Sequence, residues 1–159
     1  MILLGHAIVG GALAATQSNP VAAFFIALAS HYATDMIPHY EYDARILLTN
    51  PRSREARSAY VRVAIDGMLG VIVPLLIFAP QTVTAAVPLL AGIVGGMLPD
   101  VLWGFSKLFP RNRILAAHFR FHYRVHTFFT DKEFPRLGGT ITLAICACAI
   151  WFGLRFSAL

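Results

Sequence analysis

Charged residues are scarce in this chain of 159 residues. Asp, Glu, Lys and Arg make up 13% of it, hydrophobic residues make up 57%, and the mean hydropathy is +0.65. A soluble domain contains roughly 25% charged and 45–50% apolar residues. The composition therefore excludes an ordinary water-soluble domain. It predicts a single integral membrane domain over residues 1–159, built as an all-α, polytopic helical bundle.

Cysteine is also scarce, and no two histidines are adjacent. Cys146 and Cys148 lie two residues apart in an apolar run. On a helix they point to different sides, so we expect neither a disulfide nor a pair of metal ligands. The first residues lack the basic n-region of a secretory signal peptide. Internal repeats and low-complexity segments are absent too, so nothing in the sequence divides the chain into domains.

Apolar runs separated by turn residues predict about five membrane spans. They cover Met1–Thr16, Val21–Ile37, Tyr60–Phe78, Val83–Leu98 and Leu137–Phe156. A spanning helix needs about 20 apolar residues, so full crossing by the first run is left open. The polar interval 40–59 is expected to form a loop or a surface helix, and the fourth span is expected to end at Pro99. Gly92 and Gly96 favour close helix packing within that span.

Three of the six histidines lie in the stretch His118–His126, four residues apart each time. On a helix, His118, His122 and His126 share one face, while Arg120 and Arg124 lie on another. Imidazole is the commonest metal ligand, and a pair of histidines four residues apart can bind one ion. His118 and His126 would be about 12 Å apart along the axis, so we do not expect them to share an ion. The alternative is an amphipathic surface helix whose histidines bind nothing.

Further ionisable residues interrupt the apolar runs or follow them directly. They are His6, His31, Asp35, His39, Asp66 and Asp100. Such groups cost roughly 2.5–3.5 kcal/mol each at the centre of a span on insertion scales, which favours a functional role. Structural alternatives stay open for several of them. Asp35 and Asp66 can pair with arginines, Asp66 with Arg62 in particular, Asp100 can cap a helix, and His6 can be a packed core histidine.

Threading the apolar runs back and forth through a bilayer puts every histidine and all eight acidic residues on one side. Twelve of the thirteen Lys and Arg residues fall on that side as well, and only Arg155 falls on the other. Because positive residues prefer the cytoplasm, we expect the shared side to be cytoplasmic. This placement explains the formal net charge of +5 without a nucleic-acid partner and adds attraction to anionic lipid headgroups.

Histidine and aspartate together suit Zn²⁺, Mn²⁺ or Fe²⁺ better than Mg²⁺ or Ca²⁺, which prefer oxygen ligands. We expect a divalent transition metal, Zn²⁺ before Mn²⁺ or Fe²⁺, and two ions. The candidate ligands are His6, His31, Asp35, His39, Asp66, Asp100, His118, His122 and His126. Two-ion sites generate hydroxide for attack at phosphorus, with Asp35 and Asp100 as candidate catalytic carboxylates. Arg124 is a candidate catalytic residue that binds phosphate, because guanidinium can bind it in a bidentate manner.

Four short motifs stand out: Gly5-His6, Ser30-His31-x3-Asp35-x2-Pro38-His39, Gly96-x2-Pro99-Asp100 and His122-x-Arg124-x-His126-Thr127. Together they resemble the bacterial inner-membrane family of membrane-bound metal-dependent hydrolases. The later motif of that family, His-Arg-Gly-x-Thr-His-Ser, is compressed in this chain. The family is distantly similar to the zinc phospholipase C and nuclease group. The resemblance implies a metal hydrolase that acts on a phosphate ester in the bacterial inner membrane.

The sequence therefore predicts a multi-pass membrane hydrolase with a metal site on the cytoplasmic side and a phosphate-bearing lipid as substrate. A di-iron membrane oxidase or desaturase is an alternative, although such enzymes usually contain more histidines, some of them adjacent. A non-enzymatic metal carrier or an assembly factor is another. A carrier is expected to have polar residues through the whole bilayer depth.

Overall fold

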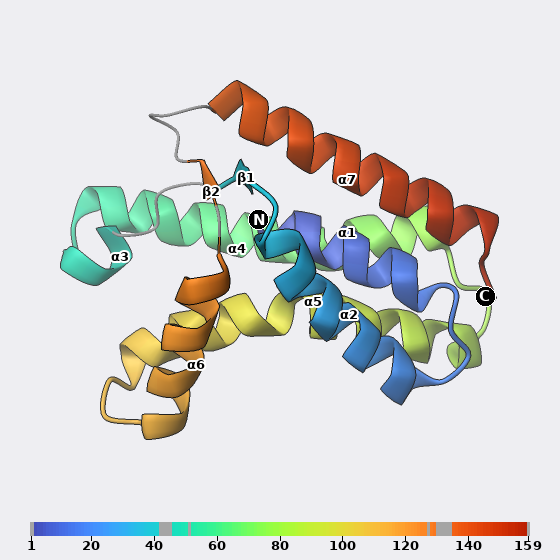
Figure 1. Ribbon diagram of the computed structural model, residues 1–159, viewed down its shortest axis with the longest axis horizontal. Coiled ribbons are helices and arrows are strands. Elements are labelled where there is room, and N and C mark those ends of the chain that lie inside the picture. The colour runs from blue at the N-terminus through green and yellow to red at the C-terminus, as the bar shows by residue number, and fades with distance from the viewer. Residues whose placement is uncertain (1, 42–45, 51, 127, 130–134, 159) are drawn as a thin grey trace.

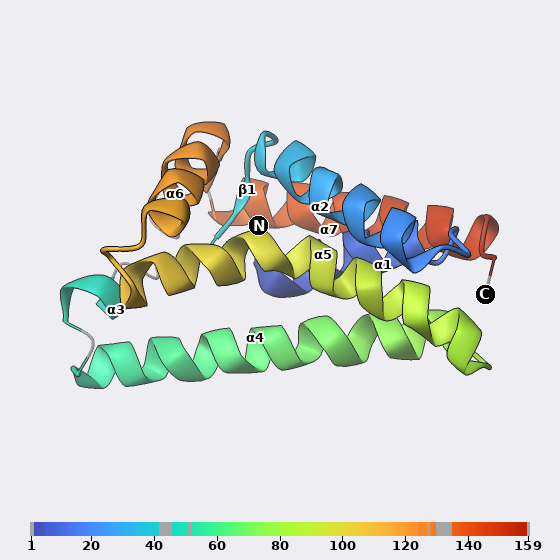
Figure 2. The ribbon, with the colours of Figure 1, turned by 90° about the horizontal axis from the view of Figure 1, so that it is seen from below.

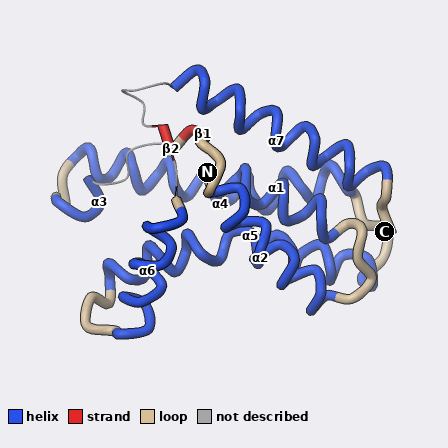
Figure 3. The backbone as a smooth tube through the Cα atoms, viewed as in Figure 1, coloured by secondary structure: helices blue, strands red, loops and turns tan. Residues whose placement is uncertain are grey.

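The computed structural model describes residues 2–41, 46–50, 52–126, 128–129 and 135–158, which are mostly helical (Figures 1 and 3). The helices are α1 (Leu3–Ala14), α2 (Pro20–Asp35), α3 (Ile46–Thr49), α4 (Arg54–Phe78), α5 (Val83–Leu108), α6 (Arg113–Val125) and α7 (Pro135–Arg155). Two short strands, β1 (His39–Tyr40) and β2 (Phe128–Phe129), pair in parallel. The predicted all-α class is confirmed, with this strand pair as a small addition.

Helix α1 is the central element of the bundle. It packs against α2, α4, α5 and α7, and nine of its 12 residues are buried. The long helices α4, α5 and α7 extend along the longest dimension of the molecule, with α6 near one end and the C-terminus at the other (Figures 1 and 2). A helix buried on all sides reads as uniformly apolar, which explains why the first run of the sequence resembles a membrane span.

Three helices are long and apolar enough to cross a membrane: Arg54–Phe78, Val83–Ser106 and Arg136–Arg155. The expectation of about five spans is therefore corrected to three. Helices α1 and α2 have 12 and 16 residues, or about 18 and 24 Å, short of the roughly 30 Å hydrocarbon core. Large apolar side chains such as Leu76, Leu143 and Trp151 are exposed on the long helices. These features are compatible with a membrane protein.

Side-chain caps define where several helices begin. Asn19 and Asn112 start α2 and α6 by accepting hydrogen bonds from backbone N–H groups of the first turn. Helix α1 receives its cap from another helix, because Asp66 of α4 accepts hydrogen bonds from the backbone N–H groups of Leu3 (2.8 Å) and Leu4 (3.3 Å). This contact fixes the start of α1 near the middle of α4.

Two helix boundaries differ from the sequence expectation. Helix α4 begins at Arg54, inside the polar interval, after a cap from Ser53. Helix α5 continues through Pro99 to Leu108 instead of ending at the proline. A proline removes one backbone donor, but a helix packed among neighbours can absorb that loss. Asp100 therefore lies within a helix and presents its side chain laterally, and it does not serve as a helix cap.

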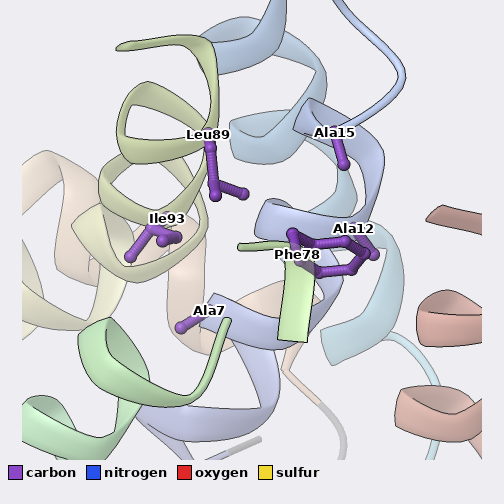
Figure 4. Packing of buried hydrophobic residues seen from close by; sticks show 6 residues of the cluster. All are labelled: Ala7, Ala12, Ala15, Phe78, Leu89 and Ile93. Atoms are coloured by element: carbon purple, nitrogen blue, oxygen red, sulfur yellow. The ribbon is translucent and has the colours of Figure 1, made fainter. Parts of the chain in front are cut away.

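Helices α1 and α5 approach each other at glycines. A Cβ on Gly10 would lie 2.5 Å from the carbonyl oxygen of Gly92, and a Cβ on Gly96 would lie 2.5 Å from the carbonyl oxygen of His6. The predicted close packing at Gly92 and Gly96 is confirmed. Beyond these contacts lies an apolar cluster, shown in Figure 4 and made of Ala7, Ala12, Ala15, Phe78, Leu89 and Ile93.

Candidate metal centre

Asp35 lies at the centre of a cluster of histidines. Its side chain is fully buried, and five imidazole Nε2 atoms lie 2.8 to 3.7 Å from its carboxylate oxygens. The histidines are His6, His31, His39, His122 and His126. Asp100 adds a second carboxylate, 3.7 to 3.8 Å from Nε2 of His6, His31 and His122. A carboxylate so removed from water needs compensation by protons or by a metal ion.

The cluster is assembled from elements far apart in the sequence. Helix α2 contributes His31 and Asp35 from its last two turns, and β1 contributes His39. The start of α1, the last third of α5 and the end of α6 complete it (Figures 1 and 2). His126 is the C-cap residue of α6, with extended backbone. The pairing of β1 with β2 holds His39 beside Phe128, two residues after His126.

Oxygen acceptors around the cluster define which nitrogen of three histidines carries the proton. Nδ1–H of His31 donates to the carbonyl oxygen of Gly96 at 2.7 Å, and Nδ1–H of His39 donates to that of Ile37 at 2.7 Å. Nδ1 of His6 lies 3.3 Å from Oγ1 of Thr34. The Thr34 hydroxyl donates to backbone carbonyls, so it accepts from the imidazole. In each neutral ring, the Nε2 lone pair therefore points toward carboxylates.

Lone pairs that face carboxylate oxygens repel each other unless a cation lies between them. Nε2 of His6 is 3.0 Å from Oδ1 of Asp35 yet forms no hydrogen bond. Nε2 of His31 lies 3.0 Å from Oδ2 of Asp35 and 3.2 Å from Nε2 of His122. Histidines whose Nδ1–H is held by an oxygen acceptor and whose Nε2 faces the site are typical of metal ligands. These residues therefore fit a divalent transition metal.

Two overlapping groups of donors could hold a metal ion. The first contains His6, His31, Asp35 and Asp100, and the second contains Asp35, His39 and His126. Within each group, the donor atoms lie within 4.8 Å of one another. His122 lies beside both groups through its 2.8 Å contact with Asp35. The structure thus brings together seven of the nine residues that the sequence predicts as ligands.

Burial keeps the peripheral imidazoles in their neutral, ligating form. It lowers the pKa of His39 to about 4 and that of His126 to about 3. Burial also raises the pKa of the Glu41 carboxyl to about 7. A neutral imidazole offers its lone pair to a metal without first losing a proton. The desolvation that disfavours imidazolium thus leaves these two rings ready to bind an ion near neutral pH.

Besides His122, three predicted site residues lie outside both donor groups. Asp66 caps α1, as described above. Nε2 of His118 lies 3.1 Å from the hydroxyl of Tyr32. Arg124 is exposed on α6, away from the buried His122. Thr127, part of the last motif, lies outside the described residues.

Sequence reasoning missed Glu41 and the groups that orient the ligands. Oε2 of Glu41 lies 3.7 Å from Nε2 of His126. The alternation of His39 and Glu41 in an extended segment was an available signal, because residues two apart on a strand point to the same face. The roles of Thr34 and of the Gly96 carbonyl had no comparable signal, since backbone acceptors become visible only once helices are packed.

No protein-family profile, curated protein or solved structure matches this chain. The site must therefore be interpreted from its own chemistry. That chemistry is a shared buried carboxylate, a second carboxylate and convergent imidazole lone pairs, set in a bundle whose described core is mostly apolar.

Proposed function

We propose that this chain is a membrane-embedded, metal-dependent hydrolase that cleaves a phosphate ester of a membrane lipid. One observation carries the proposal: three histidines with Nδ1 committed to oxygen acceptors direct their Nε2 lone pairs at buried carboxylates. The resemblance of the chain's motifs to bacterial membrane-bound metal hydrolases, with their distant similarity to zinc phospholipases, supports the choice of a phosphate ester.

Some residues of the site hold the metal ion, and others lie where the substrate enters. A bound divalent ion supplies Lewis acidity toward a phosphate ester and activates water for attack. His6, His31 and Asp35 hold the ion from positions with no exposed side-chain surface. Asp100 is 17% exposed, so it marks the side from which the substrate enters. Its carboxylate can complete the donor set of the ion and accept a hydrogen bond from the attacking water.

The depth of the site favours a lipid over a soluble ester. Asp100 lies eight residues before Leu108, the last residue of α5, and this separation corresponds to about 12 Å along the helix. Exposed arginines, among them Arg54, Arg57, Arg111 and Arg113, lie at the ends of α4 to α6. Arginines at the membrane surface can contact phosphate headgroups, and a cluster just beneath them would lie at the depth of the ester bonds of a lipid.

The packing of the part of the bundle away from Asp35 favours an enzyme over a metal carrier. Beyond the glycine contacts, the described core consists of apolar side chains, including Phe78, Leu89 and Ile93 (Figure 4). We call the part of the bundle that contains this cluster the apolar half, and the part that contains Asp35 the site half. A carrier needs polar groups on both sides of its binding site.

Orientation in the membrane is tested with reporter fusions. The distribution of arginines predicts that segment 45–57 faces the cytoplasm and that the C-terminus at Leu159 lies outside. Fusions of alkaline phosphatase and of green fluorescent protein at both places should give opposite results. A cytoplasmic C-terminus would contradict the proposed sidedness of the site.

Activity is tested by release of phosphate or headgroup from a panel of phospholipids and lipid phosphates in detergent. Protein loaded separately with Zn²⁺, Mn²⁺ or Fe²⁺ should turn over at least one class. Asp35→Asn keeps the shape of the side chain but loses the charge that balances the ion, and His122→Ala loses an imidazole at the cluster. Both should lower turnover by about 10³-fold or more, since several kcal/mol of stabilisation is at stake.

Three results would contradict the proposal in different ways. Equal turnover by the wild type and Asp35→Asn would make Asp35 structural. Firm metal binding without turnover of any phosphate ester would favour the carrier. Iron-dependent oxygen consumption in the presence of lipid would favour the oxidase.

A further inference from the structure

We infer that the site holds two metal ions that share Asp35, with Glu41 as a ligand of the second ion. The inference rests on the metal binding proposed above and goes further by assigning donors to each ion. The first ion is assigned to His6, His31, Asp35 and Asp100. The second is assigned to Asp35, His39, His126 and Glu41.

Distances between donor atoms match the dimensions of metal coordination. Donors at about 2.0–2.2 Å from one tetrahedral ion are about 3.3–3.6 Å apart. In the first group, Nε2 of His6 and of His31 lie 3.0 Å from Asp35 and 3.8 Å from Asp100. These four separations bracket the tetrahedral value, so side-chain adjustments of a few tenths of an ångström suffice.

Three donor separations in the second group are close to the tetrahedral value, and its residues come largely from other elements. Nε2 of His39 lies 3.7 Å from Asp35 Oδ1, and Nε2 of His126 lies 3.6 Å from Asp35 Oδ2. Oε2 of Glu41 lies 3.7 Å from Nε2 of His126. Its side chain is 31% exposed, so it completes this group from the open side, as Asp100 does for the first.

Asp35 is suited to be the shared ligand, because each of its oxygens faces both groups. Oδ1 lies near His6 of the first group and His39 of the second. Oδ2 lies near His31 of the first and His126 of the second. A carboxylate between two ions is a common feature of sites in which metals act together on one phosphate ester.

Charge balance also favours two ions. The three carboxylates Asp35, Asp100 and Glu41 carry three formal negative charges when ionised, and neutral imidazoles add none. One divalent ion would leave a net negative site that repels a phosphate ester. Two divalent ions leave a net positive site that attracts it. The second ion thus gives the site the net positive charge that binding of a phosphate ester requires.

Metal stoichiometry and magnetic coupling test the inference without any assay of turnover. Full-length protein is stripped of metal in detergent, loaded with Mn²⁺ or Zn²⁺, freed of excess ion on chelating resin and analysed by mass spectrometry for metal per chain. We expect about two ions per chain. The Mn²⁺-loaded protein should give an electron paramagnetic resonance spectrum broadened by coupling between neighbouring ions.

Glu41→Gln should lower the content to about one ion per chain and restore the hyperfine-resolved spectrum of an isolated Mn²⁺ ion. Glu55→Gln is the matched control, since Glu55 is exposed in the first turn of α4, and it should retain both ions. If Glu41→Gln elutes as aggregate on size exclusion, His126→Gln replaces it with the same expected loss.

Each outcome distinguishes this inference from the proposed function. One uncoupled ion in the wild type would overturn the two-ion assignment and leave a metal hydrolase possible. Two ions retained in both Glu41→Gln and His126→Gln would overturn the assigned ligands. Absence of any bound ion in the wild type would overturn the metal site and, with it, the proposed function.

Discussion

The site half and the apolar half bury opposite kinds of side chain along the same helices. In the site half, α1 and α5 contribute His6 and Asp100 to a cluster of imidazoles and carboxylates. In the apolar half, the same helices contribute Ala12 and Leu89 to a core of small and branched side chains. The difference shows that one pair of helices can provide a rigid scaffold at one end and a reactive centre at the other.

Glycine contacts link the two halves. Gly96 brings its Cα against the backbone of His6, and its carbonyl oxygen accepts the hydrogen bond that orients His31. The contact that packs α1 on α5 thus also positions His6 and orients His31. We therefore expect a substitution in the apolar half, far from the site, to lower the stability of the fold without changing metal binding. A substitution at the glycine contact should lower both stability and metal binding.

The largest loss of stability should come from Phe78→Ala. Phe78 is buried in the apolar cluster (Figure 4), and removing a buried phenylalanine costs about 3–5 kcal/mol. Metal content per folded chain should not change, because Phe78 belongs to the apolar cluster and to neither donor group. Thermal unfolding in detergent and metal analysis measure the two quantities. Leu76→Ala on the same helix is the control, since Leu76 is 73% exposed. Loss of metal from folded Phe78→Ala would show that the halves are coupled.

Gly96→Ala should lower both the stability of the fold and the affinity for metal. The added Cβ would lie 2.5 Å from the His6 carbonyl oxygen, and overpacking of this kind costs about 1–3 kcal/mol. Separation of α1 from α5 moves His6 relative to Asp100 and displaces the Gly96 carbonyl that orients His31, so we also expect metal affinity to fall about 10–100-fold. Gly104→Ala on the same helix has no atom within 4 Å of the new Cβ and should be neutral or stabilising. Unaltered metal affinity in Gly96→Ala would mean that the ligands do not depend on this helix contact.

Much of this arrangement could be predicted from the sequence because it depends on local spacing. The helix spacing of His31 with Asp35 and of His122 with His126 indicated shared faces, and Gly92 with Gly96 indicated close packing. Residues whose roles depend on long-range contacts could not be predicted.

Asp66 shows why such roles escape sequence reasoning. Its carboxylate looks like a ligand within an apolar run, yet it caps a helix 62 residues earlier in the chain. The number of spans was wrong for a related reason. A short helix that is buried by protein on all sides has the same apolar composition as one that is surrounded by lipid.

A smaller effect on metal affinity should distinguish His118 from His122, which both lie on α6. His118→Ala removes a hydrogen bond to Tyr32, worth about 1 kcal/mol, and should leave metal content unchanged. His122→Ala on the same face removes an imidazole that hydrogen-bonds the shared ligand Asp35 at 2.8 Å, and should lower metal affinity about 10–100-fold. Isothermal titration with Zn²⁺ compares the two variants. Equal losses of affinity would place His118 among the ligands and contradict the position that the structure gives it.

The smallest effect should come from Arg124, and it tests which face of α6 belongs to the site. The sequence suggested that its guanidinium binds the reacting phosphate, whereas the structure places it on the exposed side of a helix whose buried side carries His122. From that position we expect Arg124→Ala to lower turnover less than about threefold, or about 0.6 kcal/mol, and Arg124→Lys to lower it still less. The assay is phosphate release in mixed micelles, with and without anionic lipid, because an arginine that contacts headgroups should matter more when the surface is negative. A loss of about 100-fold in Arg124→Ala, only partly restored by lysine, would require α6 to turn its arginine face toward Asp35 when substrate binds.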